Sequence, residues 1–227
     1  MKCETKYAPT NLDEVIYPSV AVERRVKAYA AGQLEGHVML YGPNGTGKTT
    51  VANLLVRAIG GANARLEDCD VEELLAKPNL RDYLRNASAW ARLTPGDKYF
   101  LILNEFDYAK RGVNKLWTAL DECGDGAMAI ITTNNPMSID RAMRSRFDMI
   151  EFAGVTAMTA LPRIQYVLKA EGLVLPDAQV LHYLKQIEHF MDLRKYFKKA
   201  DELLLLQSSG SPFPAWSGGT APALKVV

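Results

Sequence analysis

Short apolar runs alternate with longer segments of helical periodicity along the first two thirds of the chain. The apolar runs at 37–41, 99–103 and 127–133 predict buried strands, and a further strand is expected at 149–152. Two segments between these runs have helical spacing, at 49–59 and 112–123. Strands that are apolar along their whole length and alternate with helices form a parallel sheet covered on both faces. The predicted fold class is therefore α/β.

The last third of the chain has a different pattern. Three helical stretches follow one another with no strand signal between them, at 157–171, 177–189 and 192–206. They predict a small all-α domain, and the Ser-, Gly- and Pro-rich end predicts a flexible tail. The expected division is an α/β domain over 1–153, a helical domain over 154–207 and a tail over 208–227.

The composition limits which binding partners and which cellular compartment the sequence predicts. The net charge of +1 over 227 residues provides no overall field that would attract nucleic acid, so DNA binding would need a local basic patch. The cysteines Cys3, Cys69 and Cys123 form no CxxC pair, which predicts reduced thiols rather than a zinc or redox site. The polar N-terminus and the lack of a membrane-length apolar run predict a cytoplasmic protein with no membrane partner.

A glycine-rich segment lies between the first predicted strand and the first predicted helix. It fits the pattern G-x-x-x-x-G-K-S/T, in which glycines let backbone N–H groups point at phosphate oxygens and the helix start adds its dipole. Lys48 supplies a charge for the β- and γ-phosphates, and the Thr49 hydroxyl coordinates Mg²⁺. The alternative is a glycine-rich turn with an incidental lysine. The predicted ATP contacts are Gly42, Pro43, Asn44, Gly45, Thr46, Gly47, Lys48, Thr49 and Thr50.

The second predicted strand ends in a polar segment, Asn104-Glu105-Phe106-Asp107. Hydrolysis needs one group there for Mg²⁺ and one for the attacking water. Glu105 suits the water, but Asn104 occupies the metal position without a charge. A unit charge about 4 Å from Mg²⁺ is worth up to roughly 4 kcal/mol at an effective dielectric of 20. If half of this acts in the transition state, turnover slows about thirtyfold. Three interpretations of this segment remain open: slow hydrolysis, a deliberately inactivated variant, and a core strand whose acidic end is incidental.

With these motifs, residues 6–206 resemble an AAA+ ATPase, and more narrowly the clamp-loader branch, which includes replication factor C small subunits and phage-type clamp-loader ATPases. The resemblance implies a RecA-like αβα sandwich, the P-loop NTPase fold, with a helical lid. Lys6-Tyr7-Ala8-Pro9, followed by Leu12-Asp13-Glu14-Val15-Ile16, is similar to the family's adenine-pocket segment, although Ala8 replaces its arginine. This similarity assigns Tyr7, Pro9 and Ile16 to the adenine pocket.

Three further motifs support the resemblance in the family's order. Thr132-Thr133-Asn134-Asn135 looks like sensor 1, which implies that Asn134 reads the γ-phosphate or orients water. Ser145-Arg146-Phe147 resembles the motif whose arginine reaches a neighbouring subunit's ATP, although Arg144 competes for this role. Asp192-Leu193-Arg194-Lys195 is similar to sensor 2, which places Arg194 on the γ-phosphate. Taken alone, each residue also has an ordinary interpretation: Asn134 as a cap or turn residue at a strand end, and Arg146 and Arg194 as solvated surface side chains. Together they imply a homo- or hetero-oligomer with nucleotide at its subunit interfaces.

The resemblance is incomplete at the C-terminal end. Family members that load clamps carry a further helical collar, and the sequence as given has only the tail after the lid. We therefore expect either a fragment or an assembly held together by the AAA+ modules and another scaffold.

Basic residues indicate where DNA could bind. The resemblance points to the helix start at Lys110, Arg111 and Lys115, and a second helix carries Arg81 and Arg85. Such contacts to phosphates are independent of base sequence, and a solvated charged face is the alternative. The expected partner is DNA or a DNA-bound protein such as a sliding clamp.

Two other functions stay open. One is a protein-remodelling AAA+ motor. Such motors usually present an aromatic residue and a glycine in a peptide-gripping loop, and the segment 68–80 contains neither. This argues against threading of a peptide but not against other protein partners. Asn104 favours a subunit that holds ATP without hydrolysing it and serves in assembly.

Overall fold

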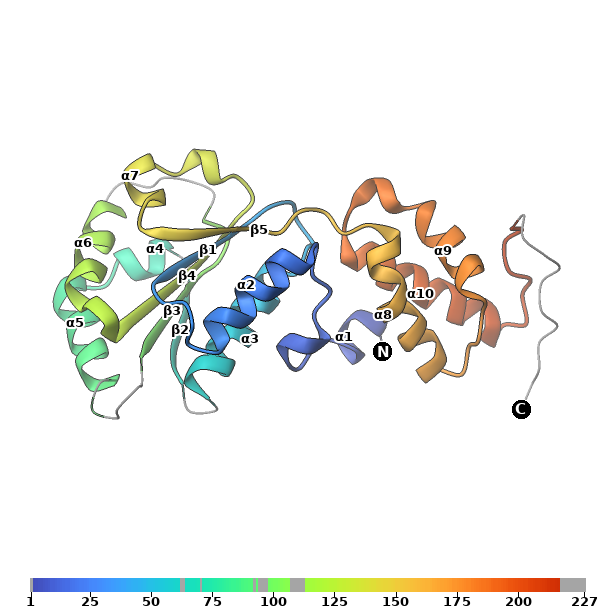
Figure 1. Cartoon of the computed structure of the whole chain (residues 1–227), viewed down its shortest axis with the longest axis horizontal. Coiled ribbons are helices and arrows are strands. Elements are labelled where there is room, and N and C mark those ends of the chain that lie inside the picture. Colours follow the sequence, from blue (N-terminus) through green and yellow to red (C-terminus); the bar gives the residue numbers. More distant parts are fainter. Residues whose placement is uncertain are drawn as a thin grey trace. The chain divides into compact units, whose positions relative to one another are not determined.

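The computed structural model describes residues 2–61, 64–69, 71–91, 93, 98–106 and 113–216 (Figure 1). It forms two compact units. One contains the sheet and consists of Thr10–Val15 and the described part of Ser19–Ala153. The other is helical and consists of the described residues up to Pro9, Ile16–Pro18, and those from Gly154 onward. The predicted first domain covered the whole of 1–153, whereas the described residues up to Pro9 and Ile16–Pro18 cluster with the helical unit. The division into functional domains stays a prediction.

A parallel sheet forms the centre of the first unit, as predicted, but it has five strands where four were expected. Its strand order is β2-β3-β4-β1-β5. Every residue of β3 and β4 is buried, which explains their continuous apolar sequences. The strands are β1 (His37–Tyr41), β2 (Arg65–Cys69), β3 (Tyr99–Leu103), β4 (Ala127–Thr133) and β5 (Phe147–Glu151).

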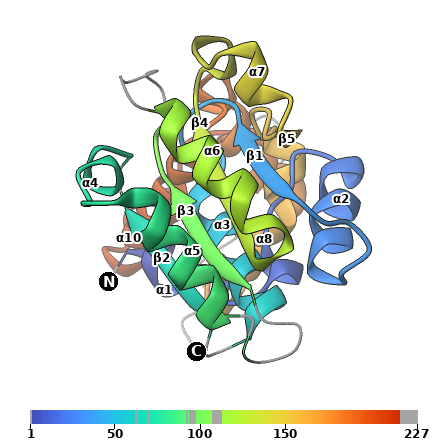
Figure 2. The ribbon, with the colours of Figure 1, turned by 90° about the vertical axis from the view of Figure 1, so that its left-hand side faces the viewer.

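Helices cover both faces of this sheet. Figure 2 looks onto the face covered by α5 and α6, and α3 lies behind the strands. Successive residues of β3 point to opposite faces of the sheet. Leu101 packs in the cluster that contains Leu116 of α6, whereas the Phe100 ring lies against Gly60 of α3. The covering helices are α2 (Val20–Ala30) and α3 (Lys48–Gly60) on one side, and α4 (Val71–Leu75), α5 (Leu80–Ala91) and α6 (Val113–Cys123) on the other.

The sequence analysis missed one strand and misplaced the start of another. β2 is an edge strand with exposed residues, so its sequence lacks the apolar pattern of a buried strand. The strand predicted at 149–152 begins at Phe147, which pairs with His37. Asp148 interrupts the apolar run, and its carboxylate accepts hydrogen bonds from the Arg25 guanidinium and the Tyr29 hydroxyl.

The second unit is built from three longer helices, α8 (Ala157–Ala170), α9 (Asp177–Lys185) and α10 (Leu193–Ser208). The buried Tyr196 donates its hydroxyl to the carbonyl of Val155 at 2.9 Å. The short α1 (Cys3–Lys6) joins α10 through the Cys3 N–H, which donates to Asp201 Oδ1 at 2.9 Å. The helical pattern predicted at 177–189 covers α9 and a separate 3₁₀ turn, η4 (Glu188–Phe190).

The segment predicted as a flexible tail begins within α10, at Ser208. Beyond the helix, Phe213 packs against the helical core and the Pro214 carbonyl accepts a hydrogen bond from the Tyr183 hydroxyl at 2.7 Å. Residues 217–227 lie outside the described part of the chain.

The remaining elements are short connections. They are α7 (Arg141–Arg144) and the 3₁₀ turns η1 (Leu12–Glu14), η2 (Gly124–Gly126) and η3 (Pro136–Ser138). Across the described ranges, no helix has the length and apolar character needed to cross a membrane.

Candidate nucleotide-binding site

The glycine-rich loop follows β1 at the carboxyl edge of the sheet, where ligands bind in open parallel sheets. Gly42, Gly45 and Gly47 have φ angles of 139°, 73° and 90°, a region that favours glycine. A Cβ atom on Gly42 would lie 2.1 Å from the carbonyl oxygen of Phe152. The curled backbone of this loop therefore depends on glycine.

Helix α3 starts directly from the loop. Its N-cap, Gly47, has no side chain to cap the helix, and the Gly47 carbonyl accepts the first helical hydrogen bond from the Val51 N–H at 2.9 Å. The N–H groups of a first helical turn have no acceptors within the helix, so they form an anion site. Thr49 and Thr50 are exposed in this turn. The Thr46 hydroxyl closes the loop by donating to the Pro43 carbonyl at 3.0 Å.

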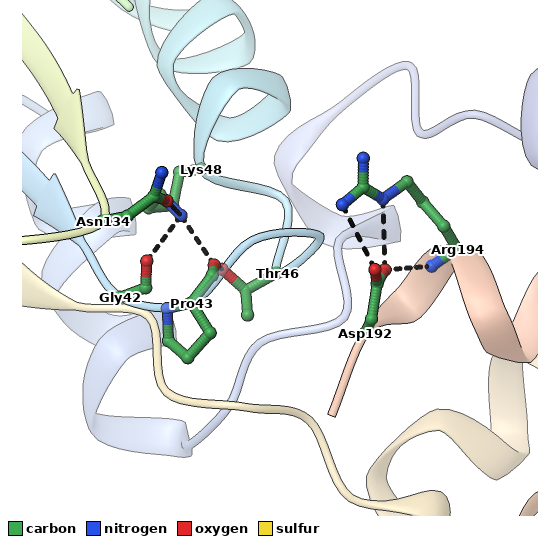
Figure 3. Close-up of polar contacts among 7 residues, drawn as sticks. All are labelled: Gly42, Pro43, Thr46, Lys48, Asn134, Asp192 and Arg194. Atoms are coloured by element: carbon green, nitrogen blue, oxygen red, sulfur yellow. Dashed lines mark hydrogen bonds and ion pairs between the residues drawn. The ribbon is translucent and has the colours of Figure 1, made fainter. Parts of the chain in front are cut away.

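The side chain of Lys48 lies inside the loop and is only 8% exposed. Its Nζ donates to the carbonyls of Gly42 at 2.8 Å and Pro43 at 2.7 Å, and to Asn134 Oδ1 at 3.0 Å (Figure 3). The structure thus brings together two residues predicted from separate motifs. All three acceptors are neutral oxygens, whereas phosphate oxygens form stronger, charge-assisted bonds with an ammonium group.

The polar segment after β3 is joined to both neighbouring strands. The Asn104 Nδ2 donates to Asp68 Oδ1 at 2.7 Å, and the Thr132 hydroxyl donates to Asn104 Oδ1 at 3.3 Å. The Glu105 N–H donates to the same hydroxyl at 3.1 Å. Glu105 has a φ of 51°, an unfavourable conformation for a residue with a side chain. These bonds hold its backbone in this conformation. Asp107 lies outside the described residues.

The sequence analysis did not identify Asp68 as a candidate site residue. It belongs to the edge strand β2, which was not predicted, and no motif covers it. Only the pairing of β2 with β3 brings its carboxylate to Asn104.

Arg146 lies between α7 and β5 and is bound to a carboxylate of α6. Its Nε lies 3.2 Å and 3.1 Å from the two carboxylate oxygens of Asp121, and its Nη2 donates to one of them at 3.0 Å. Hydrogen bonding to Asp121 raises the pKa of Arg146 further above its usual range. The competing Arg144 donates instead to Met137 Sδ at 2.9 Å. The guanidinium edge formed by Nε and Nη2 is thus occupied by Asp121.

Arg194 stands at the start of α10 and is held in a similar way. Its Nε and Nη2 donate to the carboxylate of Asp192 at 3.2 Å and 3.1 Å (Figure 3). Asp192 also caps α10 by accepting the Arg194 N–H at 2.9 Å. This carboxylate raises the pKa of Arg194. The phosphate-sensing role of Arg194 stays a prediction.

The adenine-pocket candidates belong to the helical unit. The Tyr7 hydroxyl donates to Glu171 at 2.6 Å, and its carbonyl accepts from Arg163 at 3.0 Å. Ile16 is partly buried against the helical core, and Pro9 is half-buried. Their contact with adenine is not tested by these observations and stays a prediction.

The basic residues predicted to contact DNA differ in their surroundings. Arg81 forms an ion pair with Glu122, and Arg85 forms one with Asp82 at 2.7 Å. Lys115 is exposed on α6, while Lys110 and Arg111 lie outside the described residues. Exposed ion pairs contribute about 0–1 kcal/mol, so exchanging a carboxylate for a phosphate would cost little.

The donor atoms near the loop suit a magnesium nucleotide. No group of three or more His, Cys, Asp or Glu side chains in the described ranges could hold a metal by itself. Mg²⁺ in nucleotide sites takes few protein ligands, because phosphates and waters supply the others. The exposed Thr49 hydroxyl and the Asn104 amide oxygen are donors of the required kind.

A glycine loop that joins a parallel strand to a helix and encloses a buried lysine defines a P-loop nucleotide-binding protein. Residues 38–155 match the model of the ATPase family associated with various cellular activities. The chain belongs to this AAA family.

Relatives with established names connect the chain to clamp loaders. It is 28% identical over 209 residues to the sliding-clamp-loader large subunit of Escherichia phage RB69, covering 88% of this chain and 63% of the relative. It is 26% identical over 176 residues to replication factor C small subunit 2 of Pyrobaculum arsenaticum, covering 76% of this chain and 54% of the relative. The chain therefore spans less than two thirds of these relatives. The AAA ATPase domain is thus related to clamp-loader subunits, as the sequence motifs predicted.

A solved structure supports the fold alone. RuvB of Thermotoga maritima superposes with a TM-score of 0.68 at 19% sequence identity, covering 89% of this chain and 67% of the other. This confirms the predicted P-loop NTPase fold.

Proposed function

We propose that the chain binds ATP with Mg²⁺ and hydrolyses it slowly as an oligomeric switch of the clamp-loader type, acting on DNA or on a DNA-bound protein such as a sliding clamp. Membership of the AAA family implies ATPase activity, and the names of the relatives support the clamp-loader role. The observation that carries the proposal is the buried Lys48 ammonium, which lies within the glycine loop and is hydrogen-bonded to Asn134.

In this proposal the loop amides, Lys48 and the first turn of α3 bind the phosphates, and Thr49 and Asn104 hold the metal. Bound Mg²⁺ neutralises charge on the β- and γ-phosphates. Glu105 orients the attacking water, while Asn134 exchanges its contact with Lys48 for one with the γ-phosphate or that water. Because Asn104 carries no charge, we infer slow turnover.

Arg146 is proposed to act on a neighbouring subunit's ATP. Its pair with Asp121 is exposed, so separating the two side chains costs little free energy. A guanidinium group binds phosphate oxygens in a bidentate manner and stabilises charge on the transferred group. Arg194 serves the same purpose from the helical lid. An arginine supplied by a neighbour makes hydrolysis depend on assembly.

Nucleotide binding is tested by Lys48→Ala. Because this change removes the only ammonium hydrogen-bonded within the described loop, we expect ATP affinity to fall by about a hundredfold or more in a calorimetric titration. Lys169→Ala, on an exposed position of α8, is the matched control and should bind like the wild type. Unchanged affinity in Lys48→Ala would contradict the proposal.

The partner class is tested by measuring ATPase rate and particle mass by light scattering, with and without DNA. Stimulation together with growth of the particle on DNA supports the proposal. If both quantities are indifferent to DNA, the DNA part is wrong and a protein partner is favoured.

The neutral Asn104 supports a second candidate, an assembly subunit that holds ATP without hydrolysing it. A single-turnover experiment with radiolabelled ATP separates the two. Recovery of intact ATP from the complex after hours identifies the locked subunit, whereas recovery of ADP identifies the slow enzyme.

A further inference from the structure

A chain of hydrogen bonds runs along the carboxyl edge of the sheet from β2 to β4. It leads from the Glu105 N–H to the Thr132 hydroxyl, from that hydroxyl to Asn104 Oδ1, and from Asn104 Nδ2 to Asp68 Oδ1 at 2.7 Å. Asn104, at the position expected to carry the metal-side charge, is neutral. The carboxylate of Asp68 is hydrogen-bonded directly to it.

The direction of these bonds fixes the orientation of the Asn104 amide. Since its NH₂ group is turned to Asp68 on β2, its oxygen faces Thr132 on β4. In the strand order β2-β3-β4-β1-β5, the glycine loop follows β1, so the oxygen faces the loop side of β3. Donation to a carboxylate also polarises the amide and makes its oxygen a stronger acceptor.

We propose that Asp68 is a positioning residue and that Asp68 and Asn104 together replace a single metal-side carboxylate. Asp68 sets the amide orientation and supplies the negative charge, while the Asn104 oxygen is the group presented to the metal. This inference rests on the proposed function. The replacement is partial because the charge acts across an intervening side chain, which is consistent with slow turnover.

The exposed position of Asp68 allows a sharp test of charge against structure. Asp68→Asn keeps an oxygen acceptor for Asn104 and removes the charge, so a merely structural role would be preserved. Glu73→Gln removes one charge from an exposed position of the nearby α4 and is the matched control. Thermal melting verifies that each variant is folded.

The measurement is the affinity of Mn²⁺ for the complex with a non-hydrolysable ATP analogue, determined by electron paramagnetic resonance. We expect Asp68→Asn to weaken Mn²⁺ binding by about tenfold, because the lost charge acts through one side chain near a protein surface. In the Asn104→Asp background, where the charge stands at position 104, the same change should alter binding by less than about twofold. Glu73→Gln should leave binding unchanged.

Several outcomes would overturn the inference. Unchanged Mn²⁺ affinity in Asp68→Asn shows that its charge is not used. Equal weakening in both backgrounds, or equal weakening by Glu73→Gln, shows an effect of overall charge rather than replacement. Binding of a fluorescent ATP analogue in the presence of saturating Mg²⁺ tests the proposed function separately. If the wild type fails to bind that analogue, the proposed function is wrong. If binding is retained but Asp68→Asn has no effect on Mn²⁺, only the role of Asp68 is wrong.

Discussion

Replacing Gly42 by alanine should damage the loop far more than the strain of its positive φ angle alone explains. The backbone of Gly42 has a φ of 139°, and an added Cβ would lie 2.1 Å from the Phe152 carbonyl oxygen and 2.8 Å from its carbon. Two hydrogen bonds oppose relief of this overlap, from the Gly42 N–H to Thr133 and from the Phe152 N–H to Tyr41. The backbone must break one of these contacts to admit a methyl group.

The expected cost has two parts. The backbone conformation costs about 1–3 kcal/mol for a residue with a Cβ. Displacing tightly packed backbone adds about 1–3 kcal/mol. Taking about 3 kcal/mol in total, the melting temperature should fall by about 6–12 °C for a protein of this size. ATP binding should also weaken, because the Gly42 carbonyl is one of the oxygens that hold Lys48.

Gly32→Ala separates the two parts. Gly32 has a φ of 69°, and an added Cβ would meet nothing within 4 Å. This control should lose only the backbone term of about 1–2 kcal/mol, or about 2–8 °C. Differential scanning calorimetry without nucleotide measures both variants. If their melting temperatures fall by equal amounts, the contact with Phe152 has no energetic importance and the reasoning is wrong.

Three further predictions concern catalysis and pH. Arg146→Ala should lower the ATPase rate by at least about a hundredfold while calorimetric ATP affinity stays nearly constant. A monomer that is fully active by light scattering and phosphate release would refute the role in trans. Asn104→Asp should raise steady-state phosphate release by up to about thirtyfold, and an equal or lower rate would contradict the explanation of slow turnover. Burial lowers the pKa of His37 from its ordinary 6.5, and its Nδ1 accepts the Ala129 N–H. Because the unfolded state then binds more protons, the free energy of unfolding should decrease as the pH falls below about 6.5. Denaturant titrations of wild type and His37→Gln at pH 7.5 and 5.5 measure this, and an equal pH dependence in both would exclude His37 as the cause.

How far the sequence predicted the fold depended on burial. β3 and β4 were predicted because every residue is buried and therefore apolar. β2 was missed because an edge strand with exposed residues needs no such pattern. The end of α9 was misjudged because η4 continues its helical periodicity after a break.

The candidate site was predictable only where its residues are neighbours in sequence. The glycine loop is a local motif, and the spacing of its residues reflects the backbone conformation that the loop adopts. Two of the carboxylates bonded to candidate residues are distant in sequence: Asp68 and Asn104 are separated by 36 positions, and Asp121 and Arg146 by 25. No spacing rule connects such pairs, because strand and helix packing alone brings them together.

The close approach of Gly42 to Phe152 has a mechanical consequence. Phe152 is the residue after β5, and the helical unit resumes at Gly154. Closely packed backbone segments transmit displacement rather than absorb it. We therefore expect any shift of the glycine loop to displace the backbone at Phe152 as well, because the two segments leave no room between them for even a methyl group.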